Sequence, residues 1–165
     1  MNVRISRALL LGLMRAAAAS PHAEICGVLR GREGEVRTAI AADNVAAAPS
    51  HRFEIDPAVL LRCHRLARRA GALRILGYYH SHPDGRPYPS STDAAMAQPD
   101  GKLWLIVTDR EARLWRAVPH GSMHGRFDPV AFDLIAGKRV ATSVAAVLRS
   151  ERAECWSVEL EYFRD

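Results

Sequence analysis

The sequence predicts a single domain of the α/β class, built on a mixed β-sheet flanked by helices. The chain has 165 residues, which is enough for one ordinary domain and short for two. Hydrophobic residues make up 48% of it and charged residues 25%, a balance typical of a globular chain rather than a disordered one. Strand-like apolar runs alternate with helical patterns along the chain, as in sheets that helices cover.

Residues 1–20 are expected to form an amphipathic helix. An apolar residue recurs every three or four positions, at Ile5, Leu9, Leu13 and Ala16 or Ala17. Pro21 follows where such a helix should end. A secretory signal is the weaker alternative, because the apolar run is interrupted early by Arg15.

A hairpin and a second helix are expected next. Residues 25–30 have the composition of a short buried strand, and the glycine-containing turn at 31–34 allows residues 35–42 to return as its partner. Asp56 is a suitable N-cap and Pro57 a suitable first helical residue. The helix that they begin is expected to run to about residue 70.

The second half of the chain contains further strand and helix signals. The expected elements are a central strand at 73–79, a loop at 80–89, a helix from Ser90 or Ser91 to about Ala97, and strands at 103–108 and 112–118. Beyond His120 the pattern favours helices at 129–135 and 140–150 and a strand at 156–163. We therefore expect a core over residues 1–120 and a C-terminal extension of the same domain over residues 121–165.

Charge and cysteine content limit the possible partners and the compartment. The net charge is +5, and four arginines of the second helix form a basic stripe, at Arg62, Arg65, Arg68 and Arg69. Such a stripe is usually a solvated face, and no aromatic interleaving or binding motif points to nucleic acid. The sequence contains no run of about 18 apolar residues, so it predicts no membrane-spanning helix. Three widely spaced cysteines, Cys26, Cys63 and Cys155, fit a reducing, cytoplasmic setting.

The segment from His80 to Asp93 carries the strongest chemical signal. His80 and His82 are two residues apart at the end of a hydrophobic strand, so in an extended chain both rings lie on one face. Asp93 follows in the first turn of a helix, from which its carboxylate can turn back toward the histidines. Two histidines and one carboxylate leave a fourth position open, which is the pattern of catalytic rather than structural zinc.

Zinc-dependent hydrolysis also needs a base and a donor for the oxyanion. Glu24, just ahead of an apolar strand, is the candidate general acid/base. Ser90, three residues before Asp93, is the candidate that assists the tetrahedral intermediate. Both have structural alternatives. Glu24 could be a solvated acid at a strand edge, and Ser90 with Asp93 could be a helix-capping pair unless Ser91 caps instead.

These residues together resemble the JAMM signature of the catalytic MPN+ or JAB/Mov34 metallopeptidases. The resemblance rests on Glu24 followed by the stretch 26–29, on the motif His80-Ser81-His82-Pro83, and on Ser90 and Asp93 after a six-residue spacer. The segment 53–57 is also similar to the family's segment before its second helix. The resemblance covers roughly residues 1–118 and is closest to the compact prokaryotic form.

The resemblance implies a cytidine-deaminase-like core and one Zn²⁺ per chain, held by His80, His82 and Asp93, with Glu24 as general acid/base and Ser90 as the assisting hydroxyl. It implies a deubiquitinase-like peptidase or isopeptidase, whose partner is a ubiquitin-like or sulfur-carrier protein cleaved after its C-terminal Gly-Gly. A non-catalytic MPN-type scaffold and a zinc peptidase acting on cell-wall peptides remain as alternatives. The oligomeric state and the substrate-binding residues are not predicted.

Overall fold

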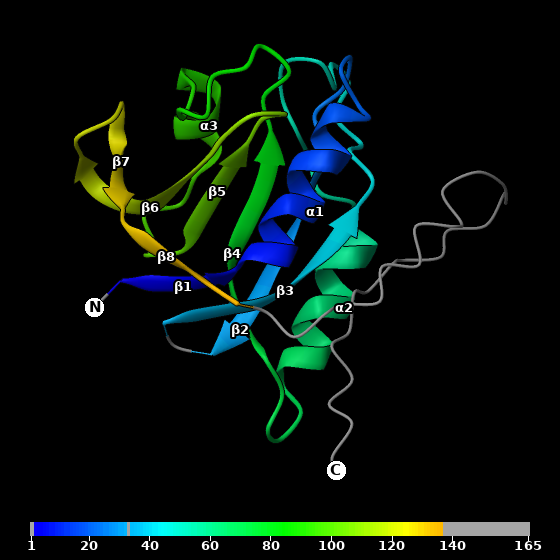
Figure 1. Ribbon diagram of the computed structural model, residues 1–165, viewed down its shortest axis with the longest axis vertical. Helices are drawn as coiled ribbons and strands as arrows, with labels where there is room; N and C mark the ends of the chain where they lie inside the picture. The colour runs from blue at the N-terminus through cyan, green and yellow to red at the C-terminus, as the bar shows by residue number, and fades with distance from the viewer. Residues whose placement is uncertain (1, 33, 137–165) are drawn as a thin grey trace, which may run out of the picture.

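The computed structural model describes residues 2–32 and 34–136, which form one sheet with helices on both faces (Figure 1). The helices are α1 (Arg7–Ala18), α2 (Pro57–Ala67) and α3 (Ser91–Met96). The strands are β1 (Val3–Ser6), β2 (Cys26–Arg32), β3 (Glu35–Ala42), β4 (Arg74–Ser81), β5 (Leu103–Val107), β6 (Ala112–Gly121), β7 (Gly125–Val130) and β8 (Phe132–Ile135). This arrangement confirms the predicted α/β class.

The sheet is mixed, and its strand order is β7-β6-β5-β4-β2-β3-β1-β8. Strand β4 lies between β5, to which it is parallel, and β2, to which it is antiparallel. The β2–β3 pair is antiparallel, as expected for the predicted hairpin, and so is the β5–β6 pair. The predicted central position of the strand that precedes His80 is thus confirmed.

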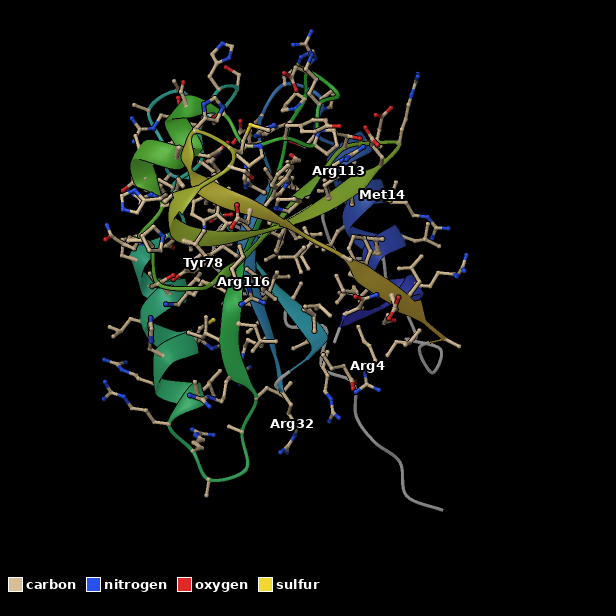
Figure 2. The ribbon with its side chains drawn as sticks, turned by 90° about the vertical axis from the view of Figure 1, so that its left-hand side faces the viewer. Arg4, Met14, Arg32, Tyr78, Arg113 and Arg116 are labelled. Carbon is tan, nitrogen blue, oxygen red and sulfur yellow. The ribbon has the colours of Figure 1, made fainter. Side chains whose placement is uncertain are left out.

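Helix α1 covers one face of the sheet, and α2 and α3 cover the other. Leu10, Leu13 and Ala17 of α1 pack on buried residues such as Leu29 and Leu105. On the opposite face, Cys63 of α2 packs against Val28 and Ile40, and α3 packs in a separate cluster around two tryptophans. Figure 2 shows Met14 on the side of α1 and Tyr78 on the side of α2. Burial of both faces explains the nearly continuous apolar sequence of the central strands.

Two helices begin where the sequence indicates. Asp56 is the N-cap of α2, with Pro57 in its first turn, and its carboxylate accepts a hydrogen bond from the Ala58 amide at 2.8 Å. Ser90 is the N-cap of α3. Helix α2 ends at Ala67, before the predicted end near residue 70.

Two expectations were wrong. The first residues of the predicted N-terminal helix form β1, which pairs in parallel with β3 and β8, and the helix begins only at Arg7 after the Ser6 cap. Residues 129–135, expected as a helix, belong to β7 and β8. Pairing with β6 and β1 overrides a short apolar pattern that is compatible with either structure. The predicted elements at 140–150 and 156–163 lie outside the described residues.

Within residues 2–32 and 34–136, no helix is long and apolar enough to cross a membrane.

Close packing at the centre of the sheet requires small residues. Gly27 of β2 lies against Tyr79 and the Ile40 carbonyl, where a Cβ atom would overlap both. This close approach sets β2 tightly beside β4, at the end of the sheet where the histidines lie.

Candidate metal centre

The candidate metal centre lies where β4 ends. His80 is the second-last residue of β4, and His82 follows the strand directly, with its amide bonded to the Val107 carbonyl of β5 at 3.0 Å. Asp93 lies in the first turn of α3. The loop between the strand and the helix returns the chain to the histidines, as the sequence predicted.

His80, His82 and Asp93 are all buried and offer ligand atoms within 4.8 Å of one another. The two Nε2 atoms are 2.9 Å apart, and they lie 3.2 Å and 3.4 Å from Oδ1 and Oδ2 of Asp93 respectively. Tetrahedral zinc with bonds of about 2.0–2.1 Å places neighbouring ligands about 3.3 Å apart. Separation and donor type therefore both fit one zinc ion at the centre of this triad.

Burial and mutual contact perturb the protonation of the triad. Burial lowers the pKa of His80, and the hydrogen bond that Asp93 accepts from the imidazole only partly opposes this effect. For His82, burial is again the largest single cause and acts in the same direction, but the hydrogen bond to Asp93 and the negative charges of Asp93 and Glu24 together outweigh it, and the pKa is raised. Burial alone would raise the pKa of Asp93, yet its hydrogen bonds to both histidines hold it well below its usual range. A carboxylate that stays ionised beside two imidazoles is a suitable donor set for a divalent cation.

Aromatic packing orients His80. Its ring is fully buried and stacks on Phe53, with the ring centroids 4.4 Å apart and an interplanar angle of 19°. The indole of Trp104 lies almost perpendicular to the imidazole, at 5.8 Å. Nδ1 of His80 has no hydrogen-bond partner among the described residues. Packing against two aromatic rings therefore holds this imidazole, in place of the hydrogen bond that usually orients a ligand histidine.

A hydrogen bond orients His82. Its Nδ1 lies 2.8 Å from the carbonyl oxygen of Arg86, in the loop that leads to α3. If Nδ1 donates to this carbonyl, Nε2 is left with a free lone pair directed at the other two ligands. The loop thus sets the tautomer required for metal binding.

Asp93 and Ser90 form a reciprocal capping box. The Asp93 amide donates to Ser90 Oγ at 3.1 Å, and Asp93 Oδ2 accepts from the Ser90 amide at 2.7 Å. The Ser90 hydroxyl also donates to Oδ2, at 2.7 Å. The capping alternative is therefore realised at Ser90 and not at Ser91. These bonds aim the carboxylate back toward the histidines.

Glu24 is buried, with only 6% of its surface exposed, so the solvated alternative is wrong for this residue. Its Oε2 atom has no hydrogen-bond partner among the described residues. Burial raises the pKa of Glu24 to about 7; the positive charge of His82 opposes the increase, and the negative charge of Asp93 adds to it. A buried carboxyl group that is coupled to the triad and titrates near neutrality is a suitable proton acceptor.

Sequence reasoning did not assign the residues that support the site. Phe53 and Trp104 pack on His80, and Ser81 Oγ accepts a hydrogen bond from the Ile25 amide at 2.9 Å, next to Glu24. Asn44 binds the backbone of Glu24 from a distant loop. Phe53 and Ser81 do belong to stretches that carry the family resemblance, namely residues 53–57 and the motif that contains the two histidines. Nothing local in the sequence marks Asn44.

Comparisons with known proteins agree with this geometry. Residues 6–118 match the family described as prokaryotic homologs of the JAB domain. A desampylase of Haloferax volcanii is 41% identical over 95 residues, which are 56% of this chain and 67% of that protein. A CysO-cysteine peptidase of Mycobacterium tuberculosis is 34% identical over 110 residues, which are 64% of this chain and 74% of that protein.

Solved structures support the same fold. A solution structure of a Desulfitobacterium hafniense protein is similar with a TM-score of 0.67 and 23% identity, covering 82% of this chain and 94% of the other. A JAB1/MPN domain protein from Archaeoglobus fulgidus has a TM-score of 0.52 and 19% identity, covering 79% and 98%. The solved structures share the fold, and the match over residues 6–118, which the buried triad fits, shows that the chain belongs to the prokaryotic homologs of the JAB domain, the compact form of the JAMM/MPN metallopeptidases.

Proposed function

We propose that the chain is a zinc-dependent peptidase or isopeptidase that hydrolyses the bond after the C-terminal Gly-Gly of a ubiquitin-like or sulfur-carrier protein. The observation that carries this proposal is the buried His80-His82-Asp93 triad beside the buried carboxyl group of Glu24, whose Oε2 has no hydrogen-bond partner among the described residues. The substrate class is supported by two relatives, one named a desampylase and the other a CysO-cysteine peptidase.

In the proposed reaction, His80, His82 and Asp93 hold one Zn²⁺. The bound ion would polarise the scissile carbonyl and increase the acidity of the attacking water. Glu24 accepts a proton from that water and delivers it to the leaving amine as the C–N bond breaks. A pKa of about 7 suits a group that must both accept and release a proton near neutral pH.

Ser90 assists the tetrahedral intermediate in this proposal. Its hydroxyl donates to Asp93 Oδ2, so the hydroxyl must rotate away from Asp93 to donate to the oxyanion. The amide-to-carboxylate bond of the capping box would keep Asp93 in place during that rotation. Ser90 would then serve both the helix cap and the reaction.

We also propose a cytoplasmic location and a single domain. Cys26 is a free thiol, which fits a reducing compartment. Strands β7 and β8 belong to the same sheet as the other described strands, which supports assigning residues 121–136 of the predicted extension to the domain of residues 1–120.

The test combines metal content with cleavage. The chain and its Glu24→Gln variant are purified with zinc present, and zinc per chain is measured. Both are then given a ubiquitin-like protein whose terminal Gly-Gly carries a fluorogenic amide. We expect one zinc in each protein and a decrease in turnover of about 10²–10⁴-fold in the variant, the usual contribution of a positioned base.

Two outcomes would contradict the proposal in different ways. Near-normal turnover by Glu24→Gln would remove Glu24 from the role of base. A zinc-loaded parent chain that leaves the Gly-Gly probe intact would overturn the substrate class, whereas absence of zinc from the parent would overturn the metal site.

A further inference from the structure

We propose that Asn44 is a positioning residue for catalysis, which fixes Glu24 relative to the metal ligands; this inference rests on the proposed role of Glu24. Asn44 follows β3, twenty residues away in sequence from Glu24, and its side-chain amide contacts five backbone groups. These contacts join the segment that carries the base to the segment that packs on a metal ligand.

The position of the Glu24 carboxyl group depends on its backbone. Glu24 precedes β2, so the ladder of the sheet does not hold its peptide groups. Its Oε2 atom has no hydrogen-bond partner among the described residues, so the side chain itself is weakly anchored. What fixes the carboxyl group is therefore the placement of the Glu24 peptide groups.

Both peptide groups of Glu24 are bound by the loop that follows β3. The Glu24 amide donates to the carbonyl of Pro49 at 2.7 Å. The Glu24 carbonyl accepts from Asn44 Nδ2 at 3.0 Å, and the same nitrogen lies 3.5 Å from the Pro49 carbonyl. Asn44 therefore binds the Glu24 carbonyl directly, and it also contacts the Pro49 carbonyl that binds the Glu24 amide.

The same amide group also fixes Phe53. Asn44 Nδ2 donates to the Arg52 carbonyl at 3.1 Å, and Asn44 Oδ1 accepts from the Glu54 amide at 3.0 Å. These two residues flank Phe53, whose ring stacks on His80. One side chain therefore sets the distance between the base and a ligand that is buried against Phe53. An error of about 1 Å in such a placement can cost about 10²-fold in rate.

Asn44→Asp separates the contacts of the side-chain oxygen from those of the side-chain nitrogen, which donates to Glu24 and also to Arg52. Aspartate keeps the oxygen that accepts from the Ala46 and Glu54 amides, but it replaces the donor facing Glu24 with an oxygen that repels the carbonyl. Asn44→Ala removes all five contacts. The matched control is Asn2→Ala, because Asn2 is an exposed asparagine whose amide donates to Asp133, away from the site.

The experiment measures zinc per chain, kcat and KM on the fluorogenic Gly-Gly probe, and hydrogen exchange of the Glu24 amide, all well below the melting temperature of each variant. For Asn44→Asp we expect full zinc, unchanged KM, a decrease in kcat of at least tenfold and faster exchange of the Glu24 amide. Asn2→Ala should behave as the parent. In a Glu24→Gln background, Asn44→Asp should cause no further decrease in kcat, because the group it positions is already lost.

Three results would overturn the proposal. One is a zinc-loaded Asn44→Asp chain with parental kcat, and another is a decrease that persists in the Glu24→Gln background. The third is unchanged exchange of the Glu24 amide in Asn44→Asp, which is read without any substrate. Failure of the parent to cleave the probe would instead reject the proposed substrate while the exchange measurement still decides the role of Asn44. If Asn44→Ala does not fold, Asn44→Asp alone supplies these readouts.

Discussion

The two halves of the candidate metal centre are held in place by different forces. The strand half is His80 with Phe53 and Trp104, where aromatic packing orients an imidazole whose Nδ1 has no partner among the described residues. The loop half is His82 with Ser90 and Asp93, where each ligand is aimed by hydrogen bonds. The strand half should therefore respond to changes in side-chain volume, and the loop half to loss of polar contacts.

The largest effect should come from removing either histidine. We expect His80→Ala and His82→Ala both to lose zinc, because two protein ligands hold a zinc ion far more weakly than three. The two variants should differ in the stability of the metal-free chain. His80→Ala leaves a cavity under Phe53 and should cost about 3 kcal/mol, whereas His82→Ala should cost less.

Denaturant unfolding in the presence of a chelator, together with measured zinc content, checks this comparison. Full zinc occupancy in either variant would reject that residue as a ligand. Equal stability of the two metal-free variants would show that the strand half does not depend on packing.

Replacement of Phe53 sharpens the comparison within the strand half. Phe53→Ala should lower stability by about 3–5 kcal/mol and weaken zinc binding by about 10–100-fold, because the His80 ring is no longer fixed. Leu13→Ala is the matched control, since Leu13 is buried on the opposite face of the sheet. It should lower stability by a similar amount and leave zinc affinity unchanged.

Competition with a chromogenic zinc chelator measures the two affinities at a temperature where both variants are folded. An equal loss of affinity in Leu13→Ala would attribute the effect to general destabilisation rather than to the contact with His80.

The loop half was more accessible to sequence reasoning than the strand half, because its contacts are local. The i, i+2 spacing of His80 and His82 and the helix cap each involve a few neighbouring residues. Residue type and spacing predicted the pair of histidines and a cap at Ser90 or Ser91, and the structure has it at Ser90. Phe53 lies 27 residues before His80 in sequence, and no local pattern indicates which ring stacks on it. Asn44 lies 20 residues after Glu24, and no local pattern links the two.

The errors in the fold have the same origin. Residues 132–135 form β8 because they pair in parallel with β1, more than 120 residues earlier in the chain. Four to seven residues of mixed polarity fit a helix or a strand equally well, so only the long-range pairing decides. The helix caps at Asp56 and Ser90 were predictable because capping is decided within one turn.

Glu24 and the metal ligand Asp93 should give the metal-free chain opposite dependences on pH. Burial raises the pKa of Glu24 from 4.5 to about 7, so its contribution to stability is present below pH 4.5 and is lost as pH rises through 7. This change is on the order of 3 kcal/mol. Asp93, whose pKa is lowered from 3.8, contributes stability that is lost only as pH falls below that value.

Unfolding of the metal-free chain from pH 5 to 8 isolates Glu24 when the parent is compared with Glu24→Gln. The parent should lose more stability over this range than the variant, since glutamine does not titrate. Parallel pH profiles for the two proteins would mean that Glu24 does not titrate in this range.

The smallest change in stability is expected in the loop half, at Ser90. Ser90→Ala removes the N-cap of α3 and should cost about 1 kcal/mol, whereas Ser90→Thr keeps a hydroxyl that can cap and should be close to neutral. The proposed catalytic role adds a second expectation. Loss of an oxyanion donor lowers kcat by about 10²–10³-fold, far more than a cap loss would at a temperature where the protein is folded.

Thermal unfolding and steady-state kinetics on zinc-loaded variants separate the two roles of Ser90. If Ser90→Ala loses stability and keeps the parental kcat, Ser90 only caps α3 and orients Asp93. If Ser90→Ala loses kcat with zinc retained and Ser90→Thr restores it, the hydroxyl acts in the reaction. The Ser90 side chain would then both orient the metal ligand Asp93 and assist the reaction. Phe53 orients His80 by packing alone and has no polar group that could take part in the reaction.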